Sequence, residues 1–344
     1  MYPRREFIKK GTIALAGLTM LPYVTADSKE KEKVMTISGP MDADAMGFTL
    51  THEHVLADFI GAEKYSKDRY DANDVYKTAL PRLVELKNTG CKTFVDCSPA
   101  YLGRDVILLK KLADASGLNI ITNTGYYGAV QEKFLPRHVY TETAEQLAAR
   151  WTKEFHEGIE GTGIKPGFIK TSTDIAPLTV AQRKIITAAA LTHQATGLTM
   201  LVHTGNGAAA NEQVKILKDV GVDPSARVWT HSQNEPDMKY HIEAAQQNCW
   251  VAFDGVSPES VDSNVGYLQR MKSEKLLERV LVSQDSGWYN VGEPSGGDFK
   301  PYTTIANLLI PKLKENGFTP HELDLLFKKN PAEAFAIKVR LKKG

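Results

Sequence analysis

The stretch Phe48-Thr-Leu-Thr-His-Glu-His-Val55 decides how the rest of the chain is interpreted. Its β-branched and apolar residues alternate roughly with polar ones, which predicts a β-strand. Side chains two positions apart on a strand leave the same face, so His52 and His54 point in one direction. Two adjacent imidazoles make half of a transition-metal site. Paired histidines also occur on solvated strand faces, so this interpretation depends on further ligands from later in the chain.

Strand and helix patterns alternate regularly after this stretch. Beyond the first strand, which ends at His54, apolar strand-like runs are predicted over 91–97, 118–124, 167–172, 198–204, 227–231, 250–254 and 279–285. Helical patterns that follow the strands are predicted over 75–87, 104–115, 143–155, 180–196, 212–219, 238–247, 265–277, 304–316 and 320–327. Eight strands, each followed by a helix, in about 300 residues predict an α/β fold, the (β/α)8 TIM barrel.

A doubly wound open sheet is the alternative fold. Such a sheet would usually carry a glycine-rich turn after its first strand, and this chain has His-Glu-His there. A short strand-turn-strand segment is also expected before the barrel, over 34–46, with Gly39-Pro40 as its turn.

The first 26 residues resemble an export signal. Arg4-Arg5-Glu6-Phe7-Ile8-Lys9 is similar to the twin-arginine motif, and an apolar stretch over 11–21 and small residues up to Ala26 follow it. A membrane anchor is the alternative, but the apolar stretch is about half of the ~20 residues that a spanning helix needs. We therefore predict a twin-arginine signal peptide over 1–26, a linker over 27–33, and one barrel domain over 34–344 of a periplasmic or otherwise exported protein.

The composition is that of a globular enzyme with a large core, because 42% of the 344 residues are hydrophobic and 24% are charged. The formal charge is +1 and no basic run occurs past residue 35. Electrostatics therefore give no case for binding nucleic acid or, after signal removal, a membrane surface. Three cysteines, Cys91, Cys97 and Cys249, lie in or beside apolar runs and are expected to be buried thiols.

Polar side chains that suit metal binding stand at the predicted C-terminal ends of five strands. They are His52, His54, Lys170, His203, His231 and Asp285. Active sites of (β/α)8 barrels lie at this end, so these side chains are expected to converge. Five imidazole or carboxylate groups exceed what one tetrahedral ion uses, which indicates two metal ions sharing a bridge.

Lys170 is the exception among these residues, because an ammonium that faces a cluster of cations would be repelled. Carboxylation of its amine by CO2 would give a carbamate, an anionic group with two oxygens that can bridge two ions. A Schiff-base lysine is the alternative, and the surrounding histidines disfavour it.

These residues stand in stretches that resemble the phosphotriesterase family of the amidohydrolase superfamily, over residues 35–337. The matching stretches are Gly47-Phe-Thr-Leu-Thr-His-Glu-His54, Gly158-Ile-Glu-Gly-Thr-Gly-Ile-Lys-Pro-Gly-Phe-Ile-Lys170, Val202-His-Thr204, Thr230-His-Ser232, Gln284-Asp285 and Asn330-Pro331-Ala332. The resemblance implies one metal ion on His52, His54 and Asp285, and a second on His203 and His231. It also implies that carboxylated Lys170 and a hydroxide bridge them. Zinc is the expected ion, with manganese, cobalt or iron as alternatives.

The same resemblance implies a hydrolase in which the metal-bridging hydroxide attacks a carbonyl or phosphoryl centre. Asp285 would take the proton from the attacking hydroxide, and His231 or a nearby group would pass it to solvent. The expected substrate is a small ester or lactone, with phosphotriester cleavage as a side activity. An amide (N-acyl) hydrolase with the same site and a non-catalytic, metal-containing ligand-binding barrel are the alternatives. The family also suggests a homodimer.

Three aromatic residues are predicted to contact the substrate. Tyr127 stands where lactonases of this family carry tyrosine, which favours a carbonyl substrate. Those lactonases also carry an arginine after the seventh-strand aspartate, and here Asp254 is followed by Gly255. Trp288 and Tyr289 belong to the loop over 286–300, which is expected to line the leaving-group pocket.

Overall fold

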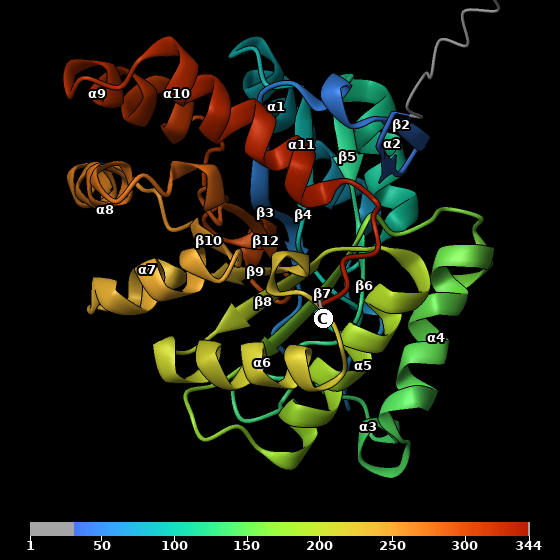
Figure 1. Ribbon diagram of the computed structural model, residues 1–344. Coiled ribbons are helices and arrows are strands. Elements are labelled where there is room, and N and C mark those ends of the chain that lie inside the picture. Colours follow the sequence, from blue (N-terminus) through green and yellow to red (C-terminus); the bar gives the residue numbers. More distant parts are fainter. Residues whose placement is uncertain (1–30, 343–344) are drawn as a thin grey trace, which may run out of the picture. The chain divides into compact units, whose positions relative to one another are not determined.

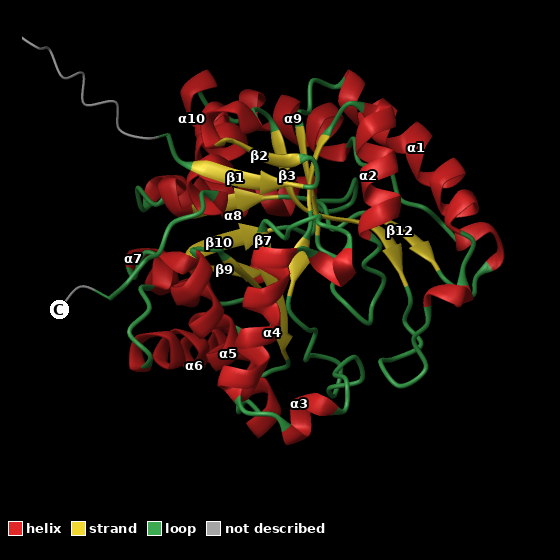
Figure 2. Cartoon of the chain, turned by 90° about the vertical axis from the view of Figure 1, so that its right-hand side faces the viewer, coloured by secondary structure: helices red, strands yellow, loops and turns green. Residues whose placement is uncertain are grey.

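The computed structural model describes residues 31–342, and within them the predicted (β/α)8 barrel is confirmed. The chain from Lys31 onward forms one compact unit. Figure 1 shows helices arranged around the strands, and the turned view in Figure 2 shows the strands inside a layer of helices. The predicted signal peptide over 1–26 and most of the predicted linker over 27–33 lie outside the described residues.

Eight strands form the barrel within the described residues. In chain order they are β3 (Thr49–Ala57), β4 (Thr93–Asp96), a third strand split into β5 (Asn119–Ile121) and β6 (Asn123–Thr124), β7 (Phe168–Thr173), β8 (Met200–Thr204), β9 (Arg227–Thr230), β10 (Trp250–Phe253) and β11 (Val280–Val282). The ladders between neighbouring barrel strands are parallel. All C-terminal strand ends therefore reach the same end of the barrel, as the predicted convergence requires.

Helices follow the strands and cover their outer faces. The α-helices are α1 (Ala72–Asn88), α2 (Val106–Ser116), α3 (His138–Thr141), α4 (Ala144–Glu157), α5 (Val180–Thr196), α6 (Gly207–Asp219), α7 (Met238–Gln246), α8 (Val261–Ser273), α9 (Ile310–Glu315), α10 (Pro320–Asp324) and α11 (Asn330–Phe335). The predicted bounds hold best where capping signals are strong. Helix α5 matches the predicted range because Thr179 and Gln182 form a capping box and Gly197 adopts a left-handed conformation at its end.

Helix α6 begins five positions earlier than predicted. Its first turn is Gly207 followed by three alanines, small residues that carry no clear apolar periodicity. The side chain of Asn206 accepts a hydrogen bond from the backbone N–H of Ala209 and so fixes the earlier start.

The core lies on both sides of the barrel wall. One set of alternating strand residues, including Val95, Phe168, Leu201 and Trp250, packs inside the barrel against Phe335 of α11. The other set packs outward against the helices. The N-terminal end of the barrel is therefore filled by apolar side chains, which leaves the C-terminal end for a functional site.

The segment before the barrel is a hairpin, as predicted, but its turn is placed differently. Strands β1 (Lys33–Thr36) and β2 (Gly39–Asp42) are antiparallel, and Thr36 pairs with Gly39. The turn residues are thus Ile37 and Ser38, and the predicted Gly39-Pro40 turn is wrong. The Thr36 hydroxyl stabilises the observed turn by donating to the carbonyl of Gly39 at 2.7 Å.

A short strand after β11 was not expected. Strand β12 (Gly287–Asn290) pairs in parallel with the second half of β3, from His54 to Ala57. It has no apolar periodicity, and its entry requires positive φ angles of 53° at Asp285 and 73° at Trp288. Such a turn is set by tertiary contacts and leaves little trace in sequence.

Two further expectations concern cysteines and membranes. The three cysteines are buried and free, as predicted. Among residues 31–342, no helix has both the length and the apolar composition needed to cross a bilayer.

Candidate metal centre and active site

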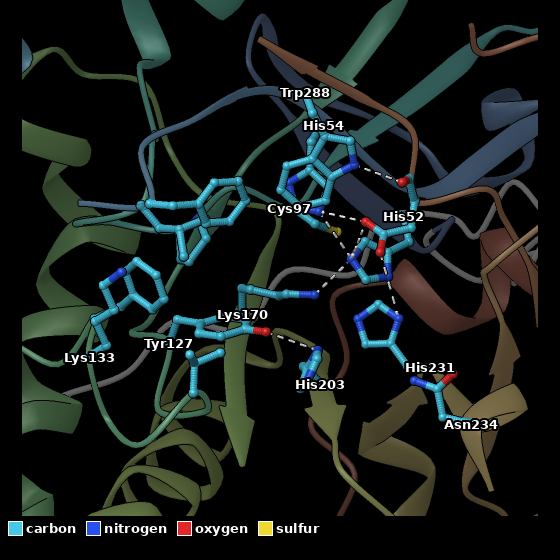
Figure 3. Close-up of a pocket in the computed structure, with 16 residues that line it drawn as sticks. His52, His54, Cys97, Tyr127, Lys133, Lys170, His203, His231, Asn234 and Trp288 are labelled. Atoms are coloured by element: carbon cyan, nitrogen blue, oxygen red, sulfur yellow. Dashed lines mark hydrogen bonds and ion pairs between the residues drawn. The ribbon is translucent and has the colours of Figure 1, made fainter. Parts of the chain in front are cut away.

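The C-terminal ends of the barrel strands surround a cavity of about 330 Å³, and its lining includes all six residues predicted as metal ligands. The other lining residues are mostly apolar; they are Phe59, Cys97, Pro99, Leu102, Tyr127, Val130, Lys133, Phe134, Asn234 and Trp288. Figure 3 shows His52, His203, His231 and Lys170 close together in this cavity. The sequence therefore placed these polar groups at the correct end of the barrel.

Hydrogen bonds fix the orientation of the two imidazoles on β3. Nδ1 of His52 donates to Oδ2 of Asp254 at 2.7 Å. Nδ1 of His54 lies 2.9 Å from Oγ of Ser98, and it must donate because that hydroxyl gives its own proton to the carbonyl of Leu56. Both Nε2 atoms therefore carry lone pairs, and they face each other at 3.3 Å. Two lone pairs at this distance repel each other unless a cation lies beside them.

Burial favours the neutral form of most of these rings. It lowers the pKa of His52, and it lowers the pKa of His54 to about 3. It also holds the pKa of His203 well below the ordinary value. At His231 burial acts in the same direction, but the Asp254 carboxylate outweighs it and raises the pKa. Neutral imidazole is the form that binds a metal ion.

Asp254 joins two of these rings from behind. Besides accepting from His52, its carboxylate lies 3.0 Å from Nδ1 of His231 and accepts from the backbone N–H of His231 at 2.9 Å. Although burial acts to raise it, these two histidines hold the pKa of Asp254 well below its ordinary value. Because both oxygens are occupied by ring N–H groups, Asp254 orients the imidazoles whose Nε2 atoms face the cavity.

We expect Asp254→Asn to lower the affinity for a divalent metal ion about 10–100-fold, which is typical of losing such an orienting partner. The amide nitrogen of asparagine would face an imidazole N–H and turn one ring away. Zinc affinity measured by competition with a chelator checks this, with exposed Asp219→Asn as the matched control. Equal affinities in the variant and the wild type would contradict the orienting role.

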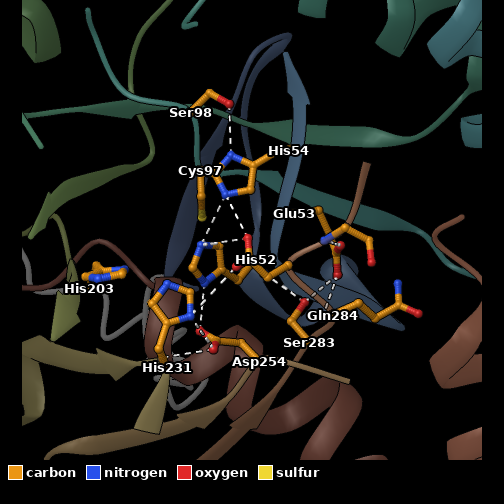
Figure 4. A network of polar contacts seen from close by, with 12 residues as sticks. His52, Glu53, His54, Cys97, Ser98, His203, His231, Asp254, Ser283 and Gln284 are labelled. Atoms are coloured by element: carbon orange, nitrogen blue, oxygen red, sulfur yellow. Dashed lines mark hydrogen bonds and ion pairs between the residues drawn. The ribbon is translucent and has the colours of Figure 1, made fainter. Parts of the chain in front are cut away.

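Glu53 is a functional residue that the sequence analysis missed. It lies between the two histidines and points to the other face of β3. Its Oε1 accepts from Oγ of Ser283 at 2.7 Å and from the N–H of Gln284 at 3.0 Å, and its Oε2 accepts from the N–H of Ser286 at 2.9 Å. Burial raises the pKa of Glu53 to about 8, and these three donors oppose that shift. Figure 4 shows Glu53 beside Ser283 and Gln284. Because Gln284 and Ser286 flank Asp285, Glu53 fixes the segment that presents Asp285.

Asp285 shows that the site fits a cation. Its Oδ1 lies 3.1 Å from Nε2 of His54, yet this buried oxygen has no hydrogen-bond partner among the described residues. The ligand atoms of His52, His54 and Asp285 all lie within 4.8 Å of one another. A buried acceptor that faces lone pairs is costly, and a metal ion among these atoms would satisfy all of them. The residues present therefore fit the predicted metal.

Lys170 reaches the same point from β7. Its side chain is 1% exposed, and Nζ lies 3.0 Å from Nε2 of His52. Within the described chain, no carboxylate lies within ion-pair distance of this amine. A buried ammonium without a counter-ion is costly, and the conversion of Lys170 to a carbamate stays a prediction.

The remaining predicted ligands lie on the other side of the site. The rings of His203 and His231 have centroids 4.4 Å apart. The hydroxyl of Tyr127 lies 3.0 Å from Nδ1 of His203, so this tyrosine contacts the group of histidines that lines the cavity. His231 follows β9 in a left-handed conformation, with φ of 60°, which turns its ring toward the cavity.

Of the two aromatic residues predicted from β12, only Trp288 lines the cavity. Its ring stacks on His54 at a centroid distance of 3.7 Å and lies 5.6 Å from Phe59. The prediction for Tyr289 is wrong. Successive side chains of a strand point to opposite faces, so Tyr289 is buried in the core between β12 and the helices.

Comparisons with known proteins agree with this geometry. Residues 32–335 match the model of the phosphotriesterase family. The chain belongs to the phosphotriesterase family. This family is part of the amidohydrolase superfamily and consists of metal-dependent hydrolases, which accounts for the cluster of histidine and aspartate side chains at the barrel mouth.

Individual members of the phosphotriesterase family are distant in sequence but match along nearly their whole length. The chain is 28% identical to the phosphotriesterase homology protein of Escherichia coli, over 86% of this chain and 100% of that protein. It is 26% identical to the N-acetyltaurine hydrolase of Rattus norvegicus, over 89% and 98%. A solved structure described as "Molecular Engineering of Organophosphate Hydrolysis Activity from a Weak Promiscuous Lactonase Template" superposes with a TM-score of 0.79 at 25% identity, over 88% and 100%.

Proposed function

We propose that the chain is a binuclear metal-dependent hydrolase of a small ester or lactone. The observation that carries the proposal is the set of unprotonated imidazole nitrogens that faces Asp285 and a buried Lys170, which has no carboxylate partner among the described residues. His52, His54 and Asp285 would hold one ion, and His203 and His231 the other. Carboxylated Lys170 would contact both. Zinc suits this set of nitrogen and oxygen donors.

The residues of the site divide the chemical work. When bound, two divalent ions would lower the pKa of a shared water and polarise the scissile carbonyl or phosphoryl oxygen. Asp285 accepts the proton of the attacking oxygen, because it is the only carboxylate among the described residues that line the cavity. His231 or a nearby group then passes that proton to solvent. Trp288 and the apolar cavity walls hold the organic part of the substrate and exclude water.

Two observations support a carbonyl substrate. Tyr127 contacts the histidine side of the site, at the position where lactonases of the family carry tyrosine. The superposed structure is described as that of a lactonase template with weak promiscuous activity. Phosphotriester cleavage is the side activity that we expect from the same site.

Amide hydrolysis is the second candidate, because one relative acts on N-acetyltaurine by its name. An amide carbonyl would bind in the same position as an ester carbonyl, but its amine leaving group needs a proton. Asp285, once protonated by the attacking oxygen, could donate that proton.

A hydrolysis panel tests the proposal. Metal-loaded protein is assayed with lactones, sugar esters, N-acyl compounds and phosphotriesters, and its metal content is measured in parallel. We expect two equivalents of metal and the highest kcat/KM on an ester or lactone. The highest kcat/KM on N-acyl compounds would favour the second candidate. Two bound equivalents without turnover of any compound would leave a ligand-binding barrel instead.

Export and assembly stay predictions. We propose that the protein is exported through a twin-arginine signal and forms a homodimer. Cell fractionation of the full-length chain, with Arg4 and Arg5 both replaced by lysine as the comparison, tests export. Light scattering of the mature protein tests the dimer.

A further inference from the structure

The loop that follows β6 holds an unusual backbone over three consecutive residues. Val130, Gln131 and Glu132 have φ angles of 57°, 55° and 63°. Non-glycine residues rarely adopt this conformation, and it persists only where the surrounding structure enforces it. Here the surroundings do so, because the carboxylate of Asp174 accepts from the N–H of Val130 at 2.8 Å and of Gln131 at 3.1 Å.

The same loop is tied to the strand that carries Lys170. The N–H of Ala129 donates to Oγ of Ser172 on β7 at 2.7 Å, and Gln182 donates to Asp174 at 2.9 Å. The loop is therefore held in place from the end of β7. Its next two residues, Lys133 and Phe134, line the cavity.

Lys133 is the one lining cation, besides Lys170 and the histidines, among the described residues of the cavity. Its ammonium lies 5.5 Å from the centroid of the Phe134 ring, and no ion pair or hydrogen bond to it occurs within residues 31–342. Nearby carboxylates are engaged elsewhere: Glu132 accepts from Thr179 and Tyr140, and Glu63 accepts from Arg137.

The only carboxylate that lines the cavity within the described chain is Asp285, and it faces the imidazoles. Figure 3 shows Lys133 across the cavity from His231 and Asn234. The apolar residues Phe59, Phe134 and Trp288 also line the cavity. Lys133 is exposed at the rim, and a cation without an acidic partner beside an apolar wall attracts an anion.

We propose that the substrate carries a monoanionic carboxylate or sulfonate, away from its scissile bond, and that Lys133 binds this group. The inference rests on the proposed hydrolase function and adds the substrate class. In this arrangement the scissile carbonyl of the substrate lies beside the histidines and Asp285, and the middle of the substrate contacts Phe59, Phe134 and Trp288. The anionic group reaches the loop over 129–134. Lys133 is then a specificity residue that touches substrate without taking part in bond cleavage.

A matched pair of aryl acetates tests the inference. The probes are 4-acetoxybenzenesulfonate and the neutral 4-(methylsulfonyl)phenyl acetate, because a sulfonate is a poor metal ligand and will not be held by the ions. The measured quantity is the ratio of kcat/KM for the anionic probe to kcat/KM for the neutral probe. We expect K133M to lower this ratio up to about 5-fold, and high salt to reduce it in the wild type, since Lys133 is exposed.

Two further variants give controls. K133R keeps the charge and is expected to keep most of the ratio. Lys64 is an exposed lysine that does not line the cavity, so K64M changes the overall charge equally and is expected to leave the ratio unchanged. A ratio that is the same in K133M and the wild type, or that falls equally in K64M, would overturn the inference.

A binding measurement separates this inference from the proposed hydrolysis. Calorimetry compares 4-hydroxybenzenesulfonate with 4-(methylsulfonyl)phenol on wild type and K133M. If the wild type cleaves neither acetate, the proposed ester hydrolysis fails for these probes, and binding alone decides the role of Lys133. Weaker sulfonate binding by K133M supports the inference. Equal binding by both proteins, or no preference of the wild type for the sulfonate, refutes it.

Discussion

Asp285→Asn is expected to lower kcat/KM on the best ester or lactone by about 10²–10⁴-fold, the range that a positioned proton acceptor contributes. The substitution keeps the shape of the side chain but removes its charge and its basicity. It also replaces one ligand of the cluster with His52 and His54, so the metal content is expected to fall below two equivalents. Steady-state kinetics and elemental analysis on the same samples measure both effects.

The matched control for this variant is Asp298→Asn, because Asp298 is an exposed carboxylate in the loop after β12. It is expected to keep wild-type kinetics and metal content. Thermal unfolding shows whether the Asp285 variant is folded, since Glu53 holds its neighbours independently of its side chain. A folded Asp285→Asn protein with wild-type kcat/KM and two metal equivalents would show that another group accepts the proton.

Lys170→Met is expected to remove activity. It is also expected to reduce metal content more strongly than Asp254→Asn does, because Lys170 would bind both ions directly, whereas Asp254 only orients other ligands. The loss of metal affinity should therefore be larger than the roughly 10–100-fold loss that is typical when a hydrogen-bond partner of a ligand is removed. Methionine fills the space of the buried stem, so the fold is expected to survive. Metal titration and kinetics on esters give the two readouts.

Carboxylation itself is checked by the rate of metal uptake. Metal-free wild type is expected to take up zinc faster with added bicarbonate, since the carbamate must form before both ions are held. Lys170→Met is expected to show no such dependence, and exposed Lys215→Met on α6 serves as the matched control. If bicarbonate does not change the rate of zinc uptake by the wild type, Lys170 binds the metal as a free amine or does not bind it at all.

The fold could be predicted because its signals are local and repeated. Buried parallel strands give apolar runs, and helices such as α5 carry capping residues at both ends. The hairpin turn was misplaced because Gly39-Pro40 is a strong turn pair by composition, whereas side-chain and backbone bonds of Thr36 fix the turn two residues earlier. Strand β12 was missed because its pairing with β3 is not encoded in its own residues.

The ligand residues at the strand ends could be predicted from the sequence. The residues that orient those ligands were harder to predict. His52 and His54 follow from the alternation of one strand, and Asp285 from the end of another. Tyr289 was misassigned because nothing in the sequence fixes which of two adjacent aromatic residues faces inward when the strand itself is not recognised. Asp254 was not among the predicted ligands, and the structure shows that it orients two of them. Glu53 escaped notice because its partners Ser283, Gln284 and Ser286 lie about 230 positions away.

That long separation has a consequence for how the protein matures. His52 and His54 are synthesised early. The residues that donate hydrogen bonds to Glu53, which are Ser283, Gln284 and Ser286, are among the last residues of the barrel to be synthesised. Until they arrive, the early histidines have neither Asp285 nor a closed wall beside them. Maturation is therefore tied to completion of synthesis: a nascent or truncated chain that ends before Ser283 holds its imidazoles on an open edge and lacks the carboxylate needed to retain an ion.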